Sequence, residues 1–388
     1  MIHSRGQLDY EGVAAAFRGQ IRGRRTGYRG HVEQLQRLRD VTRLLRAQRL
    51  ERGSLDLDLP ESKVLVDDDD PERVRDIVPS RADATVREAY GLIEDLMLAA
   101  NEAVAQVFEQ GDHPTIWRVH DRPDLHALYR LAGWLAAYGI KVEAEQLARP
   151  KSMSRLMRDL RNHPAGRPLT YLALRSLKQA SYQVHNGGHF GLASSAYLHF
   201  TSPIRRYPDL MVHRLLKGLL HADGKPSGGR RQAARLPNRR QLAEIAGHSS
   251  RRERAAIEVT RRVNDIYAAC LMRDRIGDQL GGKITGLTTF GVFVGLDRPQ
   301  VDGMVRVEDL PEPVRLDGRA QRITSRSGRC LSLGDQVEVQ VLATSVSQGR
   351  IDLGLIDHHP RYTAPHRQSG RGPHRVGGRK HRGRGRRS

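Results

Sequence analysis

The sequence is poor in cysteine and has no long apolar run, and each shortage excludes a class of protein. Cys270 and Cys330 are its only cysteines in 388 residues, too few for a disulfide framework or a cysteine-based zinc site. No stretch of eighteen apolar residues occurs, so the sequence predicts no membrane-spanning helix. The N-terminal residues MIHSRGQLDYEG lack the apolar core of a secretory signal peptide. We therefore expect a cytoplasmic protein.

Acidic residues are scarce relative to basic ones. The formal net charge is +21 and the pI is about 10.7. A positive excess of this size favours a polyanionic partner, with nucleic acid ahead of a membrane surface. Residues 361–388 contain ten arginine or lysine residues and no acidic residue. Because a segment rich in Arg, Gly, His and Pro cannot build a core, we expect a disordered basic tail over 358–388.

Residue spacing predicts several elements before the C-terminal part of the chain. Apolar residues recur at helical intervals over 32–50 and 92–108, and a heavily charged helical stretch runs over about 241–275. Residues 54–66, SLDLDLPESKVLV, alternate apolar and polar side chains, which predicts a half-buried strand. The Gly, Pro and Arg content of residues 224–239 predicts an exposed loop.

Residues 278–357 change in character and predict a small closed β-barrel. Their segments are short, valine-rich and alternating, and Gly and Asp turns separate them. Phe290 and Phe293 flank Gly291 in the sequence TFGVFV. On a barrel of the OB type, such aromatic side chains form a platform on which the bases of RNA stack. The alternative is that one or both phenylalanines belong to the barrel core.

The acidic run Asp67–Asp70 raises the question of a metal site. Magnesium requires carboxylates that converge at octahedral geometry, whereas consecutive aspartates alternate in direction on a strand or fan out on a turn. The run lies between the strand-like segments KVLV and RVRDIV. We therefore expect a hairpin turn with a solvated acidic tip.

The stretch HFTSPIRRYPDLMVHR, residues 199–214, places two adjacent arginines on a loop bracketed by Pro203 and Pro208. Proline restricts the backbone, so the loop presents Arg205 with little freedom left to lose. A guanidinium group forms bidentate bonds to phosphate oxygens and stabilises charge on a transferring phosphate. The alternative is a structural brace, in which the arginines form ion pairs with Asp209 or Glu258.

Residues 189–214, HFGLASSAYLHFTSPIRRYPDLMVHR, closely resemble the signature of the ribonuclease II/ribonuclease R (RNB) family of 3′-to-5′ exoribonucleases. The resemblance extends over nearly all of residues 1–357. It includes LDYEGV at 8–13, ERGSLDLDLPE at 51–61, LIEDLMLAANEAVA at 92–105 and FGVFV in the expected barrel. Ribonuclease R-type members also often end in a basic tail.

The resemblance implies an α+β fold in three parts. Residues 1–273 would be the C-terminal part of the RNB catalytic domain, and residues 278–357 an S1 RNA-binding domain of the OB type. The basic tail would follow at 358–388.

The resemblance also implies roles for particular residues. Arg205 matches the arginine that grips the phosphate beside the scissile bond, with Arg206 next to it, and Glu258 is similar to a glutamate near the active site. Tyr10 and Glu94 match a pair that contacts the sugar and favours ribose, as suits the reading of a 2′-hydroxyl. His189 and Phe190 would shape the channel in which bases stack.

The sequence departs from the family in its metal ligands. The family holds magnesium with an aspartate cluster, D-x5-D-x-D-D, upstream of the LDYEGV match, and this chain contains no such cluster. We expect the ligands on a longer version of the chain or on a second polypeptide. The leading hypothesis is an exonuclease unit that binds single-stranded RNA by its 3′ end and releases nucleoside monophosphates. The alternative is a non-catalytic RNA-binding protein or inactive gene fragment.

Overall fold

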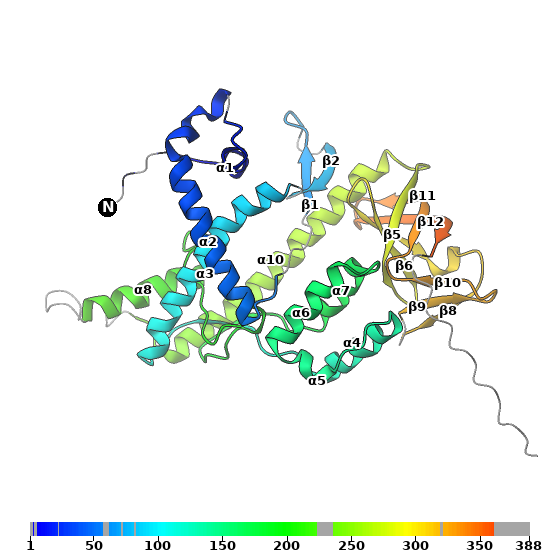
Figure 1. Cartoon of the computed structure of the whole chain (residues 1–388). Coiled ribbons are helices and arrows are strands. Elements are labelled where there is room, and N and C mark those ends of the chain that lie inside the picture. Colours follow the sequence, from blue (N-terminus) through cyan, green and yellow to red (C-terminus); the bar gives the residue numbers. More distant parts are fainter. Residues whose placement is uncertain are drawn as a thin grey trace, which may run out of the picture.

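The computed structural model describes residues 3, 6–21, 23–56, 62–70, 73–80, 83–222, 236–318 and 321–360. Helices predominate up to residue 273 and strands after it (Figure 1). This arrangement confirms the predicted α+β class. The expected basic tail lies outside the described residues, apart from its first three positions.

Three helices build an arm at the N-terminal end, with bounds α1 Tyr10–Phe17, α2 Val32–Arg52 and α3 Ala84–Gln110, and a 3₁₀ helix η1 Gly23–His31. The side chain of Asp83 caps α3 by accepting hydrogen bonds from the backbone N–H groups of Thr85 and Val86. The arm has its own small core, in which Val13 and Ala14 of α1 pack near Leu35 of α2. The helices predicted over 32–50 and 92–108 are confirmed.

A β-hairpin connects α2 to α3, formed by β1 Ser62–Val66 and β2 Val74–Pro79. Asp67–Asp70 lie in the connection between these two strands, as expected for a hairpin turn. The strand predicted over 54–66 is wrong at residues 54–56, and 57–61 lie outside the described residues. Gly53 ends α2 at a φ of 106°, and Leu55 then donates a backbone hydrogen bond to the distant carbonyl of Gly191 instead of pairing in a sheet.

Two groups of elements follow α3. The first is helical, with bounds α4 Leu125–Ala137, α5 Ala144–Leu147, α6 Pro150–Arg161 and α7 Gly166–Arg175. The second consists of β3 Trp117–Val119, β4 Ser181–Gln183, the 3₁₀ helix η2 Phe190–Leu192, α8 Tyr207–Ala222 and α10 Arg239–Arg273. Asn238 and Gln241 form a capping box that starts α10. This helix confirms the one predicted over 241–275. The expected loop over 224–239 lies outside the described residues except for 236–239, of which 236–238 are irregular as expected and Arg239 is the first residue of the helix.

The C-terminal strands close into a barrel in the order β11-β12-β7-β6-β5. Their bounds are β5 Gln279–Leu287, β6 Gly291–Leu296, β7 Asp302–Arg306, β11 Gln336–Ser345 and β12 Arg350–His359, with a 3₁₀ turn η3 at Val307–Asp309. Alternate residues such as Val292, Val294, Val339 and Val341 are buried inside, which is the period-two pattern that predicted the strands. The closed barrel over 278–357 is confirmed.

The barrel is docked against the helical part of the chain. One hydrophobic core joins Leu128, Leu160 and Leu169 of the helices to Ile284 and Val339 of the barrel. Polar contacts add direction, because the Tyr138 hydroxyl accepts a hydrogen bond from the backbone N–H of Leu333 at 3.0 Å. The orientation of the barrel relative to the helices is therefore fixed by packing.

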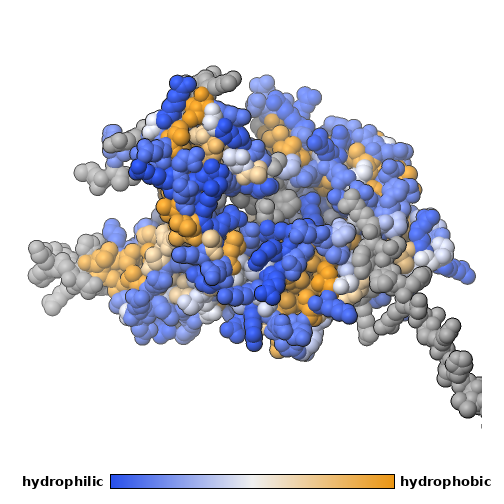
Figure 2. Space-filling model, in the orientation of Figure 1, coloured by the Kyte–Doolittle hydropathy of each residue, from blue (hydrophilic) through white to orange (hydrophobic). Residues whose placement is uncertain are grey.

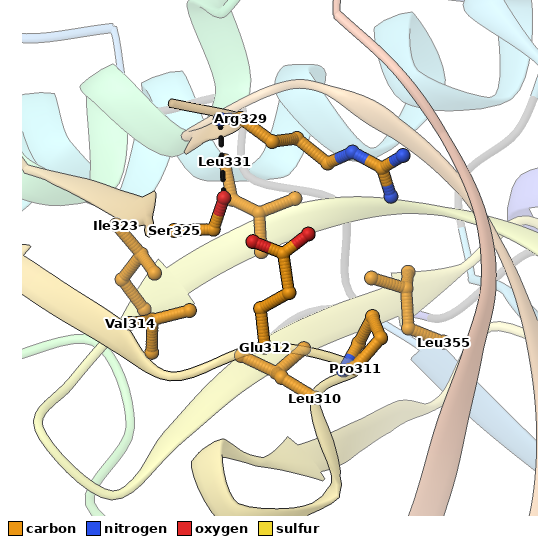
Figure 3. A pocket seen from close by; sticks show the side chains of 9 residues that line it. All are labelled: Leu310, Pro311, Glu312, Val314, Ile323, Ser325, Arg329, Leu331 and Leu355. Atoms are coloured by element: carbon orange, nitrogen blue, oxygen red, sulfur yellow. Dashed lines mark hydrogen bonds between the residues drawn. The ribbon is translucent and has the colours of Figure 1, made fainter. Parts of the chain in front are cut away.

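A small sheet in the order β10-β9-β8 lies beside the barrel, with bounds β8 Val314–Asp317, β9 Arg322–Ser325 and β10 Cys330–Ser332. Between this sheet and Leu355 of β12 is a pocket with mostly apolar walls, in which Glu312 and Arg329 are the charged side chains (Figure 3). A hydrogen bond from the Ser327 side chain lowers the pKa of Glu312. None of the residues predicted to bind RNA lines this pocket.

The surface carries hydrophobic residues mainly on the helices. Figure 2 shows such surface gathered over α8, where Leu210 and Leu220 are exposed. Among the described helices, none combines the length and the apolar character needed to cross a membrane.

Candidate functional site

The proline-bracketed loop gives its two arginines different environments. The Arg206 guanidinium donates to the Asp209 carboxylate at 2.7 Å, and Asp209 is fully buried at the start of α8. Asp209 also accepts a hydrogen bond from the backbone N–H of Ser202 at 2.8 Å, so this carboxylate holds both sides of the loop. Arg205 is exposed and forms no ion pair with any described residue. The structural brace therefore exists for Arg206 and Asp209, and it leaves the Arg205 guanidinium free.

A row of rings lies on the segments that precede this loop in the chain. The centroid of the His189 ring lies 5.1 Å from that of His120 and 5.2 Å from that of Tyr197. His199 continues the row through a 2.9 Å hydrogen bond between its Nδ1 and the Tyr182 hydroxyl. Burial lowers the pKa of His189 to about 3 and that of His199 to about 2, so both rings are neutral at pH 7.

Phe190 stands apart from its neighbour His189. It is only 5% exposed and belongs to the main hydrophobic core, where its ring meets that of His120 edge-on at 6.0 Å. A buried ring offers no free face to a base. Phe190 can therefore shape the predicted stacking channel only indirectly, through its contact with the His120 ring.

Tyr10 of α1 and Glu94 of α3 both lie near Tyr90 of α3. The Tyr10 ring stacks on Tyr90 of α3, with ring centroids 3.7 Å apart and an interplanar angle of 21°. Glu94 is exposed one helical turn after Tyr90, so it projects on the same face of α3. The predicted pair is thus brought into one neighbourhood by the packing of α1 against α3.

Phe290 and Phe293 lie on the outer surface of the barrel. Phe290 is 60% exposed, and Phe293 is half-buried on the face opposite to the interior residues Val292 and Val294. The two rings meet edge-on with centroids 6.1 Å apart. Neither ring belongs to the barrel interior, which removes the alternative that the pair is core. Arg306 lies across the strand pair from Gly291 and donates to Asp352 at 3.2 Å.

Glu258 lies on an exposed stretch of α10 and has no ion-pair partner among the described residues. It therefore does not brace the arginine loop. A neighbouring glutamate does make a link, because Arg118 of β3 pairs with Glu253 at 2.6 Å and stacks its guanidinium over the Tyr182 ring at 4.7 Å. This contact ties α10 to Tyr182 of the ring cluster.

The described residues do not fit a magnesium ion. Within them, no group of three or more His, Cys, Asp or Glu side chains is placed to hold a metal. In the acidic run, Asp67 and Asp68 both form ion pairs with Arg75, at 3.1 and 3.5 Å, so an arginine side chain already neutralises them. The expected solvated hairpin tip is confirmed for Asp68, Asp69 and Asp70, which are exposed, whereas the Asp67 side chain is only 19% exposed.

Sequence reasoning missed Asn101, which organises the chain just before the arginine loop. Its side-chain carbonyl accepts hydrogen bonds from the backbone N–H groups of Phe200 and Thr201, and its amide donates to the Tyr197 hydroxyl at 2.9 Å. A buried asparagine on the otherwise apolar side of a helix was the available signal, because a buried amide requires partners. Arg118 and Tyr182 gave no comparable signal.

Comparisons with known proteins agree with this architecture. The RNB domain family matches residues 1–222, and the S1 RNA binding domain family matches residues 273–356. The fold and the loop thus define a chain with an RNB-type part followed by an S1 barrel. The chain belongs to the RNB family, and its relatives place it among members of the ribonuclease R type.

Three curated relatives are bacterial ribonucleases R. The Aquifex aeolicus protein is 35% identical over 359 residues, which are 92% of this chain and 49% of that protein. The Thermotoga maritima protein is 36% identical over 82% of this chain and 44% of its own length, and the Escherichia coli protein is 33% identical over 92% and 43%. The chain thus spans about half the length of the curated relatives it matches.

Solved structures give the same picture. Mycoplasma genitalium RNase R in complex with ribose-methylated single-stranded RNA matches 89% of this chain and 53% of its own chain, with a TM-score of 0.78 and 27% identity. A Dss1 exoribonuclease from Candida glabrata has a TM-score of 0.64 at 14% identity, which supports the fold alone.

Proposed function

We propose that this chain is a ribonuclease R-like 3′-to-5′ exoribonuclease unit that binds single-stranded RNA and takes part in hydrolysing it to nucleoside monophosphates. Family membership supports the reaction, and the relatives' names and the RNA-bound neighbour support the substrate. The observation that carries the proposal is the free Arg205 guanidinium beside a neighbour that is locked to a buried carboxylate. A guanidinium held on a stiff loop without a protein partner is suited to a phosphate.

In this proposal, each predicted residue acts on one part of the RNA. Arg205 binds the phosphate beside the scissile bond, and Glu258 is the second residue proposed to take part in catalysis. Tyr10 and Glu94 contact the ribose, and Phe290 and Phe293 stack bases on the barrel.

Three further residues have supporting roles. His189 and Phe190 border the path of the RNA, and both rings contact the ring of His120 edge-on. Arg206 orients the loop through Asp209, so its contribution to RNA binding is indirect.

The family implies a divalent metal, and magnesium is the expected ion. Because the described residues offer no fitting set of ligands, we assign no step of the reaction to a metal on them. We propose that the acidic ligands lie outside the described residues, on a longer form of the chain or on a second polypeptide. The residues described here then supply binding, orientation and electrostatic stabilisation of phosphate.

We further propose the division of the chain and its location. Residues 1–273 form the part of the RNB domain present here, residues 278–357 the S1 domain, and residues 358–388 a basic tail that contacts RNA. The RNB match over 1–222 lies within the first of these parts, and the S1 match over 273–356 nearly coincides with the second. We propose a cytoplasmic location, since RNA is the proposed substrate.

A second candidate function is RNA binding without catalysis, and the missing metal-ligand set among the described residues favours it. Nucleoside monophosphate release from single-stranded RNA in magnesium separates the two. We expect the chain alone to bind RNA without releasing nucleotides. A chain extended upstream to carry the D-x5-D-x-D-D aspartates should release them, and Arg205→Lys should slow that release on the order of 10²-fold. An extended chain that binds RNA but releases nothing, with EDTA and Arg205→Ala as controls for contamination, would establish the non-catalytic function.

A further inference from the structure

The middle of α10 is exposed although both of its ends are buried. Leu242 and Ala246 near its start belong to the core shared with α8, and Ala269 and Met272 near its end belong to the core shared with the barrel. Between them, every residue from Arg251 to Asn264 except Glu253 is exposed. Four turns of helix without a covering element are unusual inside a packed domain, where one face is ordinarily buried.

One face of this exposed stretch carries a row of arginines. Arg251, Arg254 and Arg261 are spaced at i, i+3 and i+10, with Glu258 at i+7, so all four lie on the same side of the helix. Arg251 and Arg261 form no ion pair with any described residue, and Arg254 donates its Nε–H only to the Ser250 carbonyl of its own helix, at 3.3 Å. We call these three side chains the α10 arginine row.

The row begins beside the arginine loop. Ser250 donates its hydroxyl to the Ala246 carbonyl of α10 and accepts the backbone N–H of Tyr182 at 2.9 Å. Tyr182 in turn is hydrogen-bonded to His199, three residues before Ser202 at the start of the loop. Ser250, the residue before Arg251 in the row, is therefore linked to the start of the loop through Tyr182 and His199.

The row ends beside the barrel. The Arg262 guanidinium donates to the backbone carbonyls of Ser347, at 2.6 Å, and Gln348, in the turn between β11 and β12. Figure 1 shows α10 running from the neighbourhood of α8 to the barrel. At 1.5 Å per residue, Ser250 and Arg262 are about 18 Å apart along the helix, roughly the length of five stacked nucleotides.

We propose that single-stranded RNA lies along α10 between the barrel and the arginine loop, with its phosphates bound by the α10 arginine row. The inference rests on the proposed function, since it supplies the path between the two surfaces assigned to RNA there. Three exposed guanidinium groups on one face favour a polyanion. The exposed Val259 and Val263 are each two residues from Arg261 and so face the other side of the helix, whereas the exposed Ile257, three residues after Arg254, lies on the face of the row.

Glu258 gives the proposal a directional consequence. Its carboxylate lies in the row between Arg254 and Arg261 and repels any phosphate that follows this face. Glu258→Gln removes one negative charge and should therefore tighten RNA binding, roughly 2- to 5-fold.

The test measures affinity for a fluorescein-labelled single-stranded RNA by anisotropy at several salt concentrations. The variant is the triple Arg251→Gln/Arg254→Gln/Arg261→Gln in the full chain. A matched control removes the same charge from exposed arginines on α4 and α6, as Arg130→Gln/Arg155→Gln/Arg158→Gln. Loss of three phosphate contacts should reduce the slope of log affinity against log salt by about 2 and weaken binding on the order of 10- to 100-fold near 0.1 M salt.

The outcomes separate this inference from the proposed function. If the unmodified chain binds RNA and the α10 triple behaves like the control triple, the strand does not follow α10 and only this inference fails. If the unmodified chain does not bind RNA, both proposals fail. Replacement of the three arginines by lysine should retain most of the slope, since each phosphate contact keeps its charge, and a lost slope in that variant would also contradict the proposal.

Discussion

Removal of the Arg206 side chain tests the division of labour between the two adjacent arginines. Arg206→Ala leaves the Asp209 carboxylate fully buried with only the backbone N–H of Ser202 as a partner. Breaking a buried pair by deleting one member costs about 3–5 kcal/mol, because the remaining charge is uncompensated. The Arg206 side chain is itself 20% exposed, so water can enter in part and we expect the lower end, about 3 kcal/mol.

The matching change at Arg205 should leave stability alone. Arg205 is exposed and forms no ion pair with a described residue, and such substitutions usually stay within about 0.5 kcal/mol. For a part of this size, about 3 kcal/mol corresponds to a fall in Tm of roughly 6–12 °C, whereas Arg205→Ala should shift Tm by less than about 2 °C. Thermal unfolding followed by circular dichroism measures both.

A double-mutant cycle isolates the pair. In an Asp209→Asn background, Arg206→Ala leaves no buried carboxylate without its partner, so its cost in unfolding free energy should be less than about half of that in the unmodified chain. The two arginines should rank in the opposite order in RNA affinity, measured at a temperature at which all variants are folded. Arg205→Ala and Arg205→Lys should both weaken RNA binding, whereas Arg206→Ala should mainly lower stability. If Arg205→Ala instead lowered Tm by several degrees while Arg206→Ala did not, the assignment of the two side chains would be reversed.

Three other predictions follow from the ring cluster, the barrel and the tail. The pKa values of His189 and His199 are lower in the folded chain than in the unfolded one, so their contribution to stability is complete above about pH 6.5 and is lost as the pH falls. At pH 5.5 each histidine should lower the free energy of unfolding by about 1.4 kcal/mol. Tm should therefore fall with pH, and replacing both histidines by asparagine should flatten this dependence. Phe290→Ala and Phe293→Ala should each weaken RNA binding by about 1–3 kcal/mol. Because Phe290 is exposed, Phe290→Ala should leave Tm unchanged. A change in RNA affinity below 2-fold in both variants would exclude stacking. Deletion of 361–388 should make the salt dependence of RNA binding shallower, and an unchanged slope would mean that this segment does not touch RNA.

The long helices and the barrel were predictable because their signals are local. The 3.6-residue period over 32–50 and 92–108 and the two-residue period of the C-terminal strands both report which side chains face a core. The failure at residues 54–56 has a different cause. Leu55 binds the carbonyl of Gly191, 136 residues away in the chain, and a segment that looks like a strand is held instead by that distant partner.

The candidate site was predictable only where a motif carried it. Asp209, three residues after Arg206, was one of the two partners considered for the brace, and it is the partner of Arg206. The other, Glu258, is not, and no spacing rule could decide between a residue three positions away and one more than fifty positions away. The link from Arg118 to Glu253 was equally inaccessible, since it joins a short strand to a helix across 135 residues.

The fixed position of the barrel determines how its aromatic pair could act with the arginine loop. The hydrogen bonds of Arg262 to the β11–β12 turn, together with the core shared by the barrel and helices α4–α7, pack the barrel against the helical part that contains α10. A strand bound by the barrel would therefore meet the loop at a high effective concentration, without the entropy cost that a flexible linker imposes. The same packing requires an RNA strand long enough to cover the distance between the two surfaces. A path lined with positive charge along α10 is the physical requirement that such an arrangement sets, and the α10 arginine row satisfies it.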